Sequence, residues 1–343
     1  MSEPISKLPP YDCKILQAQT ITEDSPGPIV RDFATLLAFI GADGIEVSGK
    51  YRFLPMARLA ELNARLSRPI KLDLKRPQQK SYPSIHGLYL LLRASGLGQV
   101  RRYGKKDRLI LDAVALECWE SLNLTERYFA LLETWLLRGD TSILGERGYG
   151  ASGSIHNWPV FCQRSKDRVL SVAGDRNVEQ WLPYTPTLCT LALLDLFGMV
   201  ILQQAKSMPG KGWQIARIER TDFGEAMLHL LFENELFFDF FVPGTDEQND
   251  EPAVRLHTAL QPFFPDLQHR LQLSSPEGIA GIYVFKVALG SVWARIAIPS
   301  DCVLEELSQA ILSAFQFDSD HLYCFTYTNL FCSTHDINHP YMD

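Results

Sequence analysis

The chain has 343 residues, of which 46% are apolar and 21% charged, and its formal net charge is −7. This length accommodates two or three domains of roughly 100–150 residues each, with enough apolar side chains to fill their cores. The composition therefore excludes a small scaffold that depends on disulfides for its stability.

Cysteine usage and hydropathy predict the cellular compartment. The seven cysteines are odd in number and scattered, and most lie in apolar runs, which is typical of reduced, buried thiols. Residues 1–12 lack the apolar stretch of a signal peptide, and the apolar run at 188–202 is shorter than the roughly 20 residues that span a bilayer. We expect a cytoplasmic protein without a membrane partner.

The charge is unevenly distributed along the chain. Residues 1–220 carry 29 lysines and arginines against 22 acids, whereas residues 221–343 carry 4 against 18. The basic part would attract a polyanion such as DNA, and the acidic part would repel DNA or dock a protein. Two ordinary solvated surfaces of different charge explain the asymmetry equally well.

The first part of the chain predicts a winged-helix-like unit. Prolines interrupt residues 1–28, which favours a flexible arm. Apolar spacing then predicts helices and strands in the following order: a helix at 29–40, a short hairpin at 45–54, helices at 56–66 and 85–92, strands at 100–103 and 108–111, and helices at 113–122 and 124–137. A helix followed by a two-stranded ribbon and another helix is the order of a winged-helix unit.

A weaker copy of this order follows, and the chain then changes character. A long helix at 186–204, a strand at 213–218 and a helix at 223–231 capped by Thr221 predict a second winged-helix-like unit. Further on, strands at 282–289 and 292–298, a helix at 303–315 and a returning strand at 322–328 predict a sheet covered on one face by a helix. The predicted fold class is α+β.

These elements suggest six segments along the chain. They are a flexible arm (1–28), a helical, winged-helix-like domain (29–140), a glycine-rich loop region (141–180), a second helical, winged-helix-like unit (181–241), an acidic linker (242–278) and a small α+β domain (279–343).

The predicted ribbon carries the sharpest functional signal. Five cations surround Tyr103 within eight residues: Arg101, Arg102, Lys105, Lys106 and Arg108. A ribbon with this charge can bind phosphates and position a neighbouring helix in a groove. Lys71, Lys75, Arg76 and Lys80, just before the preceding helix, would extend the same patch. The alternative is a solvated hairpin in a unit that contacts only proteins.

Three other motifs give no assignment of catalysis, cofactor or metal. Gly148-x-Gly150-x-x-Gly153 matches the dinucleotide fingerprint in letters, but no strand precedes it and no helix follows, so we predict a loop and no cofactor. Cys332, His335 and His339 are zinc-ligand types without a Cys-x-x-Cys pair, which favours a surface loop and leaves metal binding open. His156 and Cys162 are the only close Cys/His pair, and sequence proximity alone does not make a catalytic site.

The last third of the chain resembles a known family. Tyr283, Phe285 and Val287 in the first strand, the stretch 292–295, Pro299 and the turn 317–322 resemble the plasmid pRiA4b ORF-three-like family, which also occurs as a passenger protein of an insertion element. The resemblance implies a compact β-grasp-like α+β domain, here incomplete, with no established reaction and an association with mobile elements. It marks Asp318, Asp320 and His321 as a possible family position.

Three functional hypotheses follow. The leading one is a non-enzymatic binding protein that contacts DNA through the ribbon and possesses no catalytic residue. The second is a protein-interaction adaptor whose acidic part docks a partner. The third is an enzyme with a site between the basic part (1–220) and the acidic part (221–343), around His321 and the Gly148 loop.

Overall fold

The computed structural model describes residues 8–146, 155, 157–165, 167–233, 252–272, 280–318, 322–328, 334–339 and 341. The chain divides into two compact units, a large unit of residues 1–272 with 330–333 and a small unit of residues 273–329 with 334–343. Helices and small antiparallel sheets make up both units, so the predicted mixed α+β class is confirmed.

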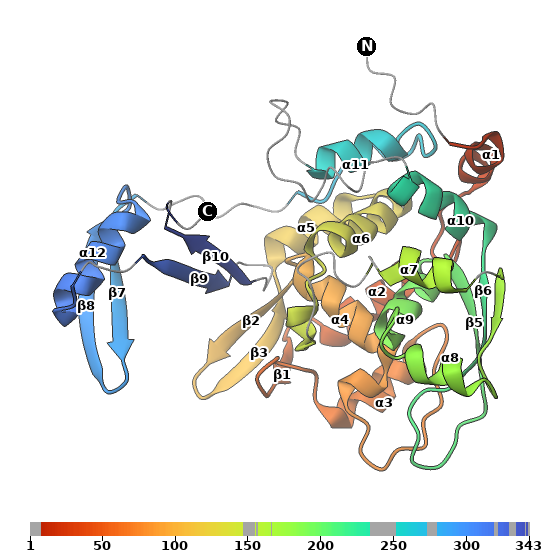
Figure 1. Ribbon diagram of the computed structural model, residues 1–343, viewed down its shortest axis with the longest axis horizontal. Coiled ribbons are helices and arrows are strands. Elements are labelled where there is room, and N and C mark those ends of the chain that lie inside the picture. Colours follow the sequence, from red (N-terminus) through yellow and green to blue (C-terminus); the bar gives the residue numbers. More distant parts are fainter. Residues whose placement is uncertain are drawn as a thin grey trace. The chain divides into compact units, whose positions relative to one another are not determined.

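The first half of the large unit has winged-helix topology. Its elements are α2 (Ile29–Ile40), β1 (Ile45–Val47), α3 (Met56–Arg65), a 3-10 turn (Gln79–Ser81), α4 (Pro83–Ala94), β2 (Gly98–Tyr103) and β3 (Lys106–Leu111). The strands form one antiparallel sheet in the order β1-β3-β2 (Figure 1). The three helices and the β2–β3 ribbon are therefore present as the apolar spacing predicts, whereas the pairing of β1 with β3 was not predicted.

One detail of this half differs from the expectation. Residues 51–54 do not form a hairpin with β1, because β1 pairs with β3 and only a single bridge joins Ser48 to Phe53. Arg52 has a left-handed backbone (φ 56°), which an extended strand cannot contain. Residues 48–53 thus form a tight turn that leads into α3.

A second winged-helix topology follows in the same unit. It comprises α7 (Asn157–Arg164), β4 (Val169–Ser171), α8 (Arg176–Trp181), α9 (Leu188–Leu196), β5 (Val200–Gln204) and β6 (Ile215–Arg220). The sheet order β4-β6-β5 repeats the order of the first sheet. The helix α10 (Asp222–Leu228) follows, capped by the Thr221 hydroxyl, which accepts a hydrogen bond from Gly224 N as predicted.

Two expectations for this stretch are wrong. The predicted helix at 186–204 ends at Leu196, because Gly198 turns the chain with a φ of +71° and Val200–Gln204 then pairs with β6. The region 141–180, for which the sequence predicts a loop, contains a 3-10 turn (Thr141–Leu144), α7, β4 and α8. Trp158 and Phe161 of α7 are fully buried, so core packing stabilises this short helix.

The two halves share one core, in which α4 and α9 pack side by side (Figure 1). Eleven of the twelve α4 residues are buried. A Cβ atom on Gly87 would lie 2.7 Å from Leu193 Cγ, so glycine permits the close approach of the two helices. The helices α5 (Ala113–Ser121) and α6 (Leu124–Arg138) complete this core, and Tyr128 donates a hydrogen bond to the Phe197 carbonyl (2.7 Å).

The N-terminal arm and the acidic linker are more ordered than expected over their described residues. α1 (Pro10–Ala18) packs against α10, with Leu16 fully buried and Asp12 Oδ2 2.7 Å from His229 Nδ1. His229 begins a π-helical turn (His229–Glu233). α11 (Pro252–Leu260) lies within the predicted linker, because its apolar residues recur at helical spacing and become buried.

The small unit contains two separate ribbons and a helix among its described residues. β7 (Ile282–Leu289) and β8 (Val292–Pro299) form the predicted hairpin, and α12 (Leu304–Phe315) packs against β8. β9 (Cys324–Thr328) pairs with β10 (Thr334–Asn338) in its own two-stranded sheet. The expectation that this strand returns to the hairpin is wrong for the described residues, because a nearer segment supplies its partner.

Two further sequence expectations concern thiols and membranes. Of the described cysteines, Cys162 and Cys189 are buried, three are half-buried and Cys324 is exposed; all are free. The expectation of mostly buried thiols is therefore only partly correct. No helix among the described residues has both the length and the apolar character needed to cross a bilayer.

Candidate nucleic-acid interface

The first wing, residues 98–111, is the β ribbon made by β2 and β3. Gly104 permits its tight turn, because its φ of +61° is unfavourable for other residues. The antiparallel register places Arg101 opposite Arg108 and Tyr103 opposite Lys106. Tyr103 is 53% exposed, and the ribbon becomes more exposed toward the turn. The ribbon thus presents Arg101, Arg102, Lys105, Lys106 and Tyr103 to solvent, as predicted. The prediction is wrong for Arg108, which is half-buried and donates from Nη2 to the Gly44 carbonyl (3.3 Å).

Most cations of the first wing already have partners. Arg102 Nη1 lies 3.1 Å from Asp107 Oδ1, and Lys106 Nζ lies 2.7 Å from Glu46 Oε2 on β1. Arg101 Nη2 lies 3.6 Å from Asp112 Oδ2. Arg101, Arg102 and Lys106 nevertheless have side chains that are 56%, 62% and 68% exposed. Surface pairs of this kind contribute only about 0–1 kcal/mol each, so a phosphate can replace the carboxylate.

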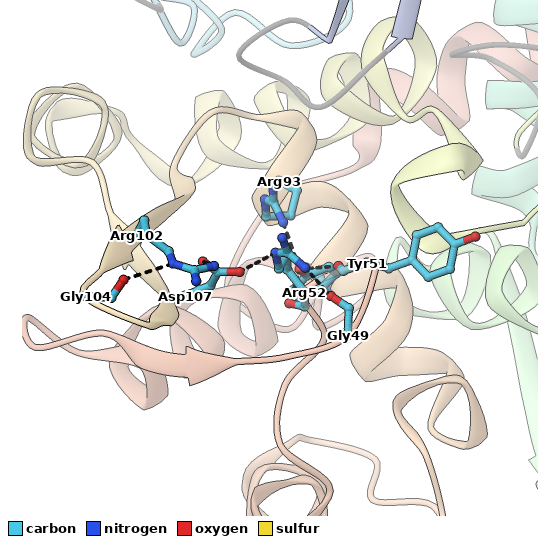
Figure 2. A network of polar contacts seen from close by, with 8 residues as sticks. Gly49, Tyr51, Arg52, Arg93, Arg102, Gly104 and Asp107 are labelled. Atoms are coloured by element: carbon cyan, nitrogen blue, oxygen red, sulfur yellow. Dashed lines mark hydrogen bonds and ion pairs between the residues drawn. The ribbon is translucent and has the colours of Figure 1, made fainter. Parts of the chain in front are cut away.

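A chain of polar contacts joins the first wing to α4 (Figure 2). Asp107 bridges Arg102 and Arg52, and Arg52 Nε lies 2.7 Å from Asp107 Oδ2. The Tyr89 hydroxyl donates to the Arg52 carbonyl (2.6 Å) and accepts from Arg93 Nη1 (2.9 Å). Both Tyr89 and Arg93 are buried residues of α4. These contacts tie the ribbon near its turn to α4 and so restrict the orientation of the wing relative to the core.

The helix that precedes the wing cannot enter a DNA groove. α4 is buried along its length and faces α9, so its side chains reach no external surface. The expectation that the ribbon positions a neighbouring helix in a groove therefore does not hold for α4. The physical reason is the second winged-helix half, which covers the helix that would otherwise be exposed.

Hydrogen bonds join the segment before α4, which carries several basic residues, to the second winged-helix half of the large unit. Gly210 N donates to the Asp73 carbonyl (2.8 Å), and Gln204 Nε2 donates to the Pro69 carbonyl (3.4 Å). Lys75 and Arg76 lie in this exposed loop. No hydrogen bond or ion pair between described residues joins either of them to the first wing.

Other predicted positions contribute no site within the described residues. Asp320, His321, Cys332, His156 and the glycines at 148, 150 and 153 lie outside them, as does the side chain of His335. Asp318 is exposed, and the His339 Nε2 atom lies 3.6 Å from Glu305 Oε2. No group of three potential metal ligands occurs among the residues that are described.

Cys162 is a poor nucleophile in this environment. It is buried in α7, and desolvation raises the pKa of its thiol to about 11 despite the nearby Arg220. The thiolate is therefore scarce at neutral pH.

Sequence patterns did not reveal the residues that organise the interface. Arg52, Glu46 and Asp107 control the charge of the first wing, but two of them are distant from it in sequence. The apolar run at 200–204 was predicted as part of a helix, so the β5–β6 ribbon and the residues Lys206 and Lys211 in its connection were not recognised. The turn residues at 209–212 were the signal that could have indicated this ribbon.

Comparisons of the chain with protein-family models, curated proteins and solved structures gave no match.

Proposed function

We propose that this chain is a non-enzymatic binding protein whose first wing contacts nucleic-acid phosphates without reading base sequence. The observation that carries the proposal is the exposure of Arg101, Arg102 and Lys106, each more than half accessible on a ribbon that Asp107 and Arg52 tie to α4. Neutralising phosphates with such residues releases counterions, which provides affinity at low salt. Sequence-independent binding follows from the burial of α4, since the helix beside the wing is not free to read base edges.

The proposal is tested by fluorescence anisotropy with labelled duplex and single-stranded DNA at several salt concentrations. The first-wing variant carries Arg101→Ala, Arg102→Ala, Lys105→Ala and Lys106→Ala. We expect it to lose at least about tenfold in affinity at low salt, and to show a smaller salt slope. The charge-matched control carries Lys14→Ala, Arg31→Ala, Arg65→Ala and Arg176→Ala, all exposed residues outside the wing. Equal affinities for the two variants would contradict the proposal.

Removing the charge of one acid in the first wing should raise the DNA affinity instead of lowering it. Asp107 holds both Arg52 and Arg102, so Asp107→Asn should free two cations and raise the DNA affinity about threefold or more. The control is Glu117→Gln, which removes the same charge from an exposed site on α5. An increase of the same size in both variants would show that only net charge matters. A decrease in the Asp107→Asn variant would show that the ion pairs are needed to shape the wing.

A protein-interaction adaptor is the second candidate. The packing of α4 against α9 favours it, because the two halves then form a rigid scaffold in which α4 is not available to a DNA groove. If the chain is such an adaptor, we expect it to show no salt-dependent affinity for DNA, so the anisotropy titration separates the two functions.

We also propose that residues 279–343 are related to the plasmid pRiA4b ORF-three-like family. The order of β7, β8 and α12, with the helix against the hairpin, supports it. It adds an association with mobile elements to the proposed nucleic-acid binding and assigns no reaction.

A further inference from the structure

A second basic surface lies on the other winged-helix half. It consists of the exposed loop 71–76 and the second wing, which is β5, β6 and the residues 205–214 between them. Its exposed cations are Lys71, Lys75, Arg76, Lys206 and Lys211. In Figure 1 the β2–β3 ribbon and the β5–β6 ribbon lie on opposite sides of α4 and α9, so this surface is separate from the first wing.

Three contacts anchor residues 68–73 to the second winged-helix half, and one of them joins the loop 71–76 directly to the second wing. Arg68 Nη1 lies 2.6 Å from Asp195 Oδ1 at the end of α9, and Gln204 Nε2 donates to the Pro69 carbonyl. The third is the bond from Gly210 N to the Asp73 carbonyl (2.8 Å). Two segments far apart in the sequence are thus held side by side, which lowers the entropic cost of ordering them around a ligand.

The cations of this surface differ from Arg101, Arg102 and Lys106 of the first wing in having no acidic partner among the described residues. No ion pair between described residues involves Lys75, Arg76, Lys206 or Lys211. Asp73 is the one acid within the loop 71–76. Nearby, Asp195 is already held by Arg68, and Glu179, which lines the same cavity as Lys206, accepts a hydrogen bond from Gly174 N. A polyanion that binds here therefore displaces no carboxylate of the described part of the chain.

We infer that the second wing and the loop 71–76 form a second phosphate-binding surface for nucleic acid. The inference rests on the proposed function and extends it to a protein that contacts the phosphate backbone at two separate places. A regularly charged, extended polyanion fits this arrangement, because the cations lie on an exposed ribbon tip and a flanking loop. Because these cations form no ion pair with a described acid, they contribute more affinity per residue than those of the first wing.

The test compares the full chain with a second-wing variant that carries Lys75→Ala, Arg76→Ala, Lys206→Ala and Lys211→Ala. We expect this variant to bind labelled duplex DNA more weakly than the first-wing variant does, and at least about tenfold more weakly than the unaltered chain at low salt. The salt slope should fall by about 0.9 for each phosphate that is no longer neutralised, hence by up to about 3.6 for the four cations. The charge-matched control should change the affinity less than about twofold. Circular dichroism must show that every variant is folded.

The outcomes separate the two proposals. If the second-wing variant binds like the control, the inference is wrong, whatever the first-wing variant does. If only the first-wing variant binds like the control, the proposed role of the first wing is wrong and the second surface stands. If the unaltered chain binds no nucleic acid at low salt, both proposals are overturned. Equal or tighter binding to vesicles of anionic lipid, abolished in the second-wing variant, would reassign the surface to membranes and overturn the inference.

Discussion

The Gly224→Ala variant is expected to lose about 2–3 kcal/mol in the free energy of unfolding. A Cβ atom at this position would lie 2.0 Å from the Met199 carbonyl oxygen and 2.8 Å from its carbonyl carbon. These are backbone atoms, so no side-chain rotation relieves the clash. The loss should occur even though alanine favours a helix over glycine by up to about 1 kcal/mol.

The surroundings of Gly224 leave little room for adjustment. The Thr221 hydroxyl accepts from Gly224 N (2.9 Å) and lies 2.8 Å from the Gly198 carbonyl oxygen, to which it can donate. Thr221 N also donates to the Met199 carbonyl (3.2 Å). The start of α10 and the turn after α9 are therefore locked together, and α10 in turn carries α1.

Urea unfolding followed by tryptophan fluorescence measures this loss. The matched control is Gly212→Ala in the second wing, where an added Cβ meets nothing within 4 Å and the backbone is not left-handed. We expect that control to stay within about 0.5 kcal/mol of the unaltered protein. Similar midpoints for both variants would mean that α10 moves away from Met199 at little cost.

The second large effect is expected at Glu126, a buried carboxylate at the start of α6. Its Oε1 accepts from His269 N (2.7 Å), His269 Nδ1 (2.8 Å) and Gln268 N (3.2 Å), and its Oε2 accepts from Asn123 N (2.8 Å). The side chain is 2% exposed. Glu126→Ala would leave several donors without an acceptor, and we expect it to cost about 3 kcal/mol of stability.

The pH dependence of stability gives an independent check. Burial alone would raise the pKa of Glu126, but hydrogen bonds from Asn123 and His269 outweigh it and lower the pKa. A carboxyl whose pKa is lower in the folded state contributes stability that is fully present above its unfolded pKa and is lost as the pH falls through the folded value. The difference between the unaltered protein and Glu126→Ala should therefore be largest near neutral pH and shrink in acid.

The control for this experiment is Glu117→Ala, which removes an exposed carboxylate from α5. It should change stability by less than about 0.5 kcal/mol at any pH. A difference for Glu126→Ala that is the same at pH 7 and in acid would mean that the carboxylate form is not what holds residues 268–269 to α6.

Local patterns predicted much of the fold. The helix at 29–40 follows from its apolar spacing and ends at Gly41, whose φ is +63°. The cap at Thr221 and the turn at Gly104 need only the chemistry of one residue. Periodicity failed at 200–204, because a short apolar run is compatible with a helix or a strand until its partner strand is known.

The candidate interface was only partly predictable. Clustered cations at 101–108 are visible in the sequence, and the exposed ribbon carries them as expected. Their charge balance is not visible, because Glu46 reaches Lys106 from a strand 60 residues away. The burial of α4 and the joining of residue 73 to residue 210 likewise depend on how the two winged-helix halves pack.

The sequence alone was sufficient to predict the mixed α+β class, the helix–ribbon–helix order of residues 85–122 and the basic character of the first ribbon, since each depends on residues close together in the chain. Tertiary structure alone decided which helix is exposed, which cations are paired and which loops share a surface. Packing of α4 on α9 and hydrogen bonds between distant segments carry that information, and neither has a local signature.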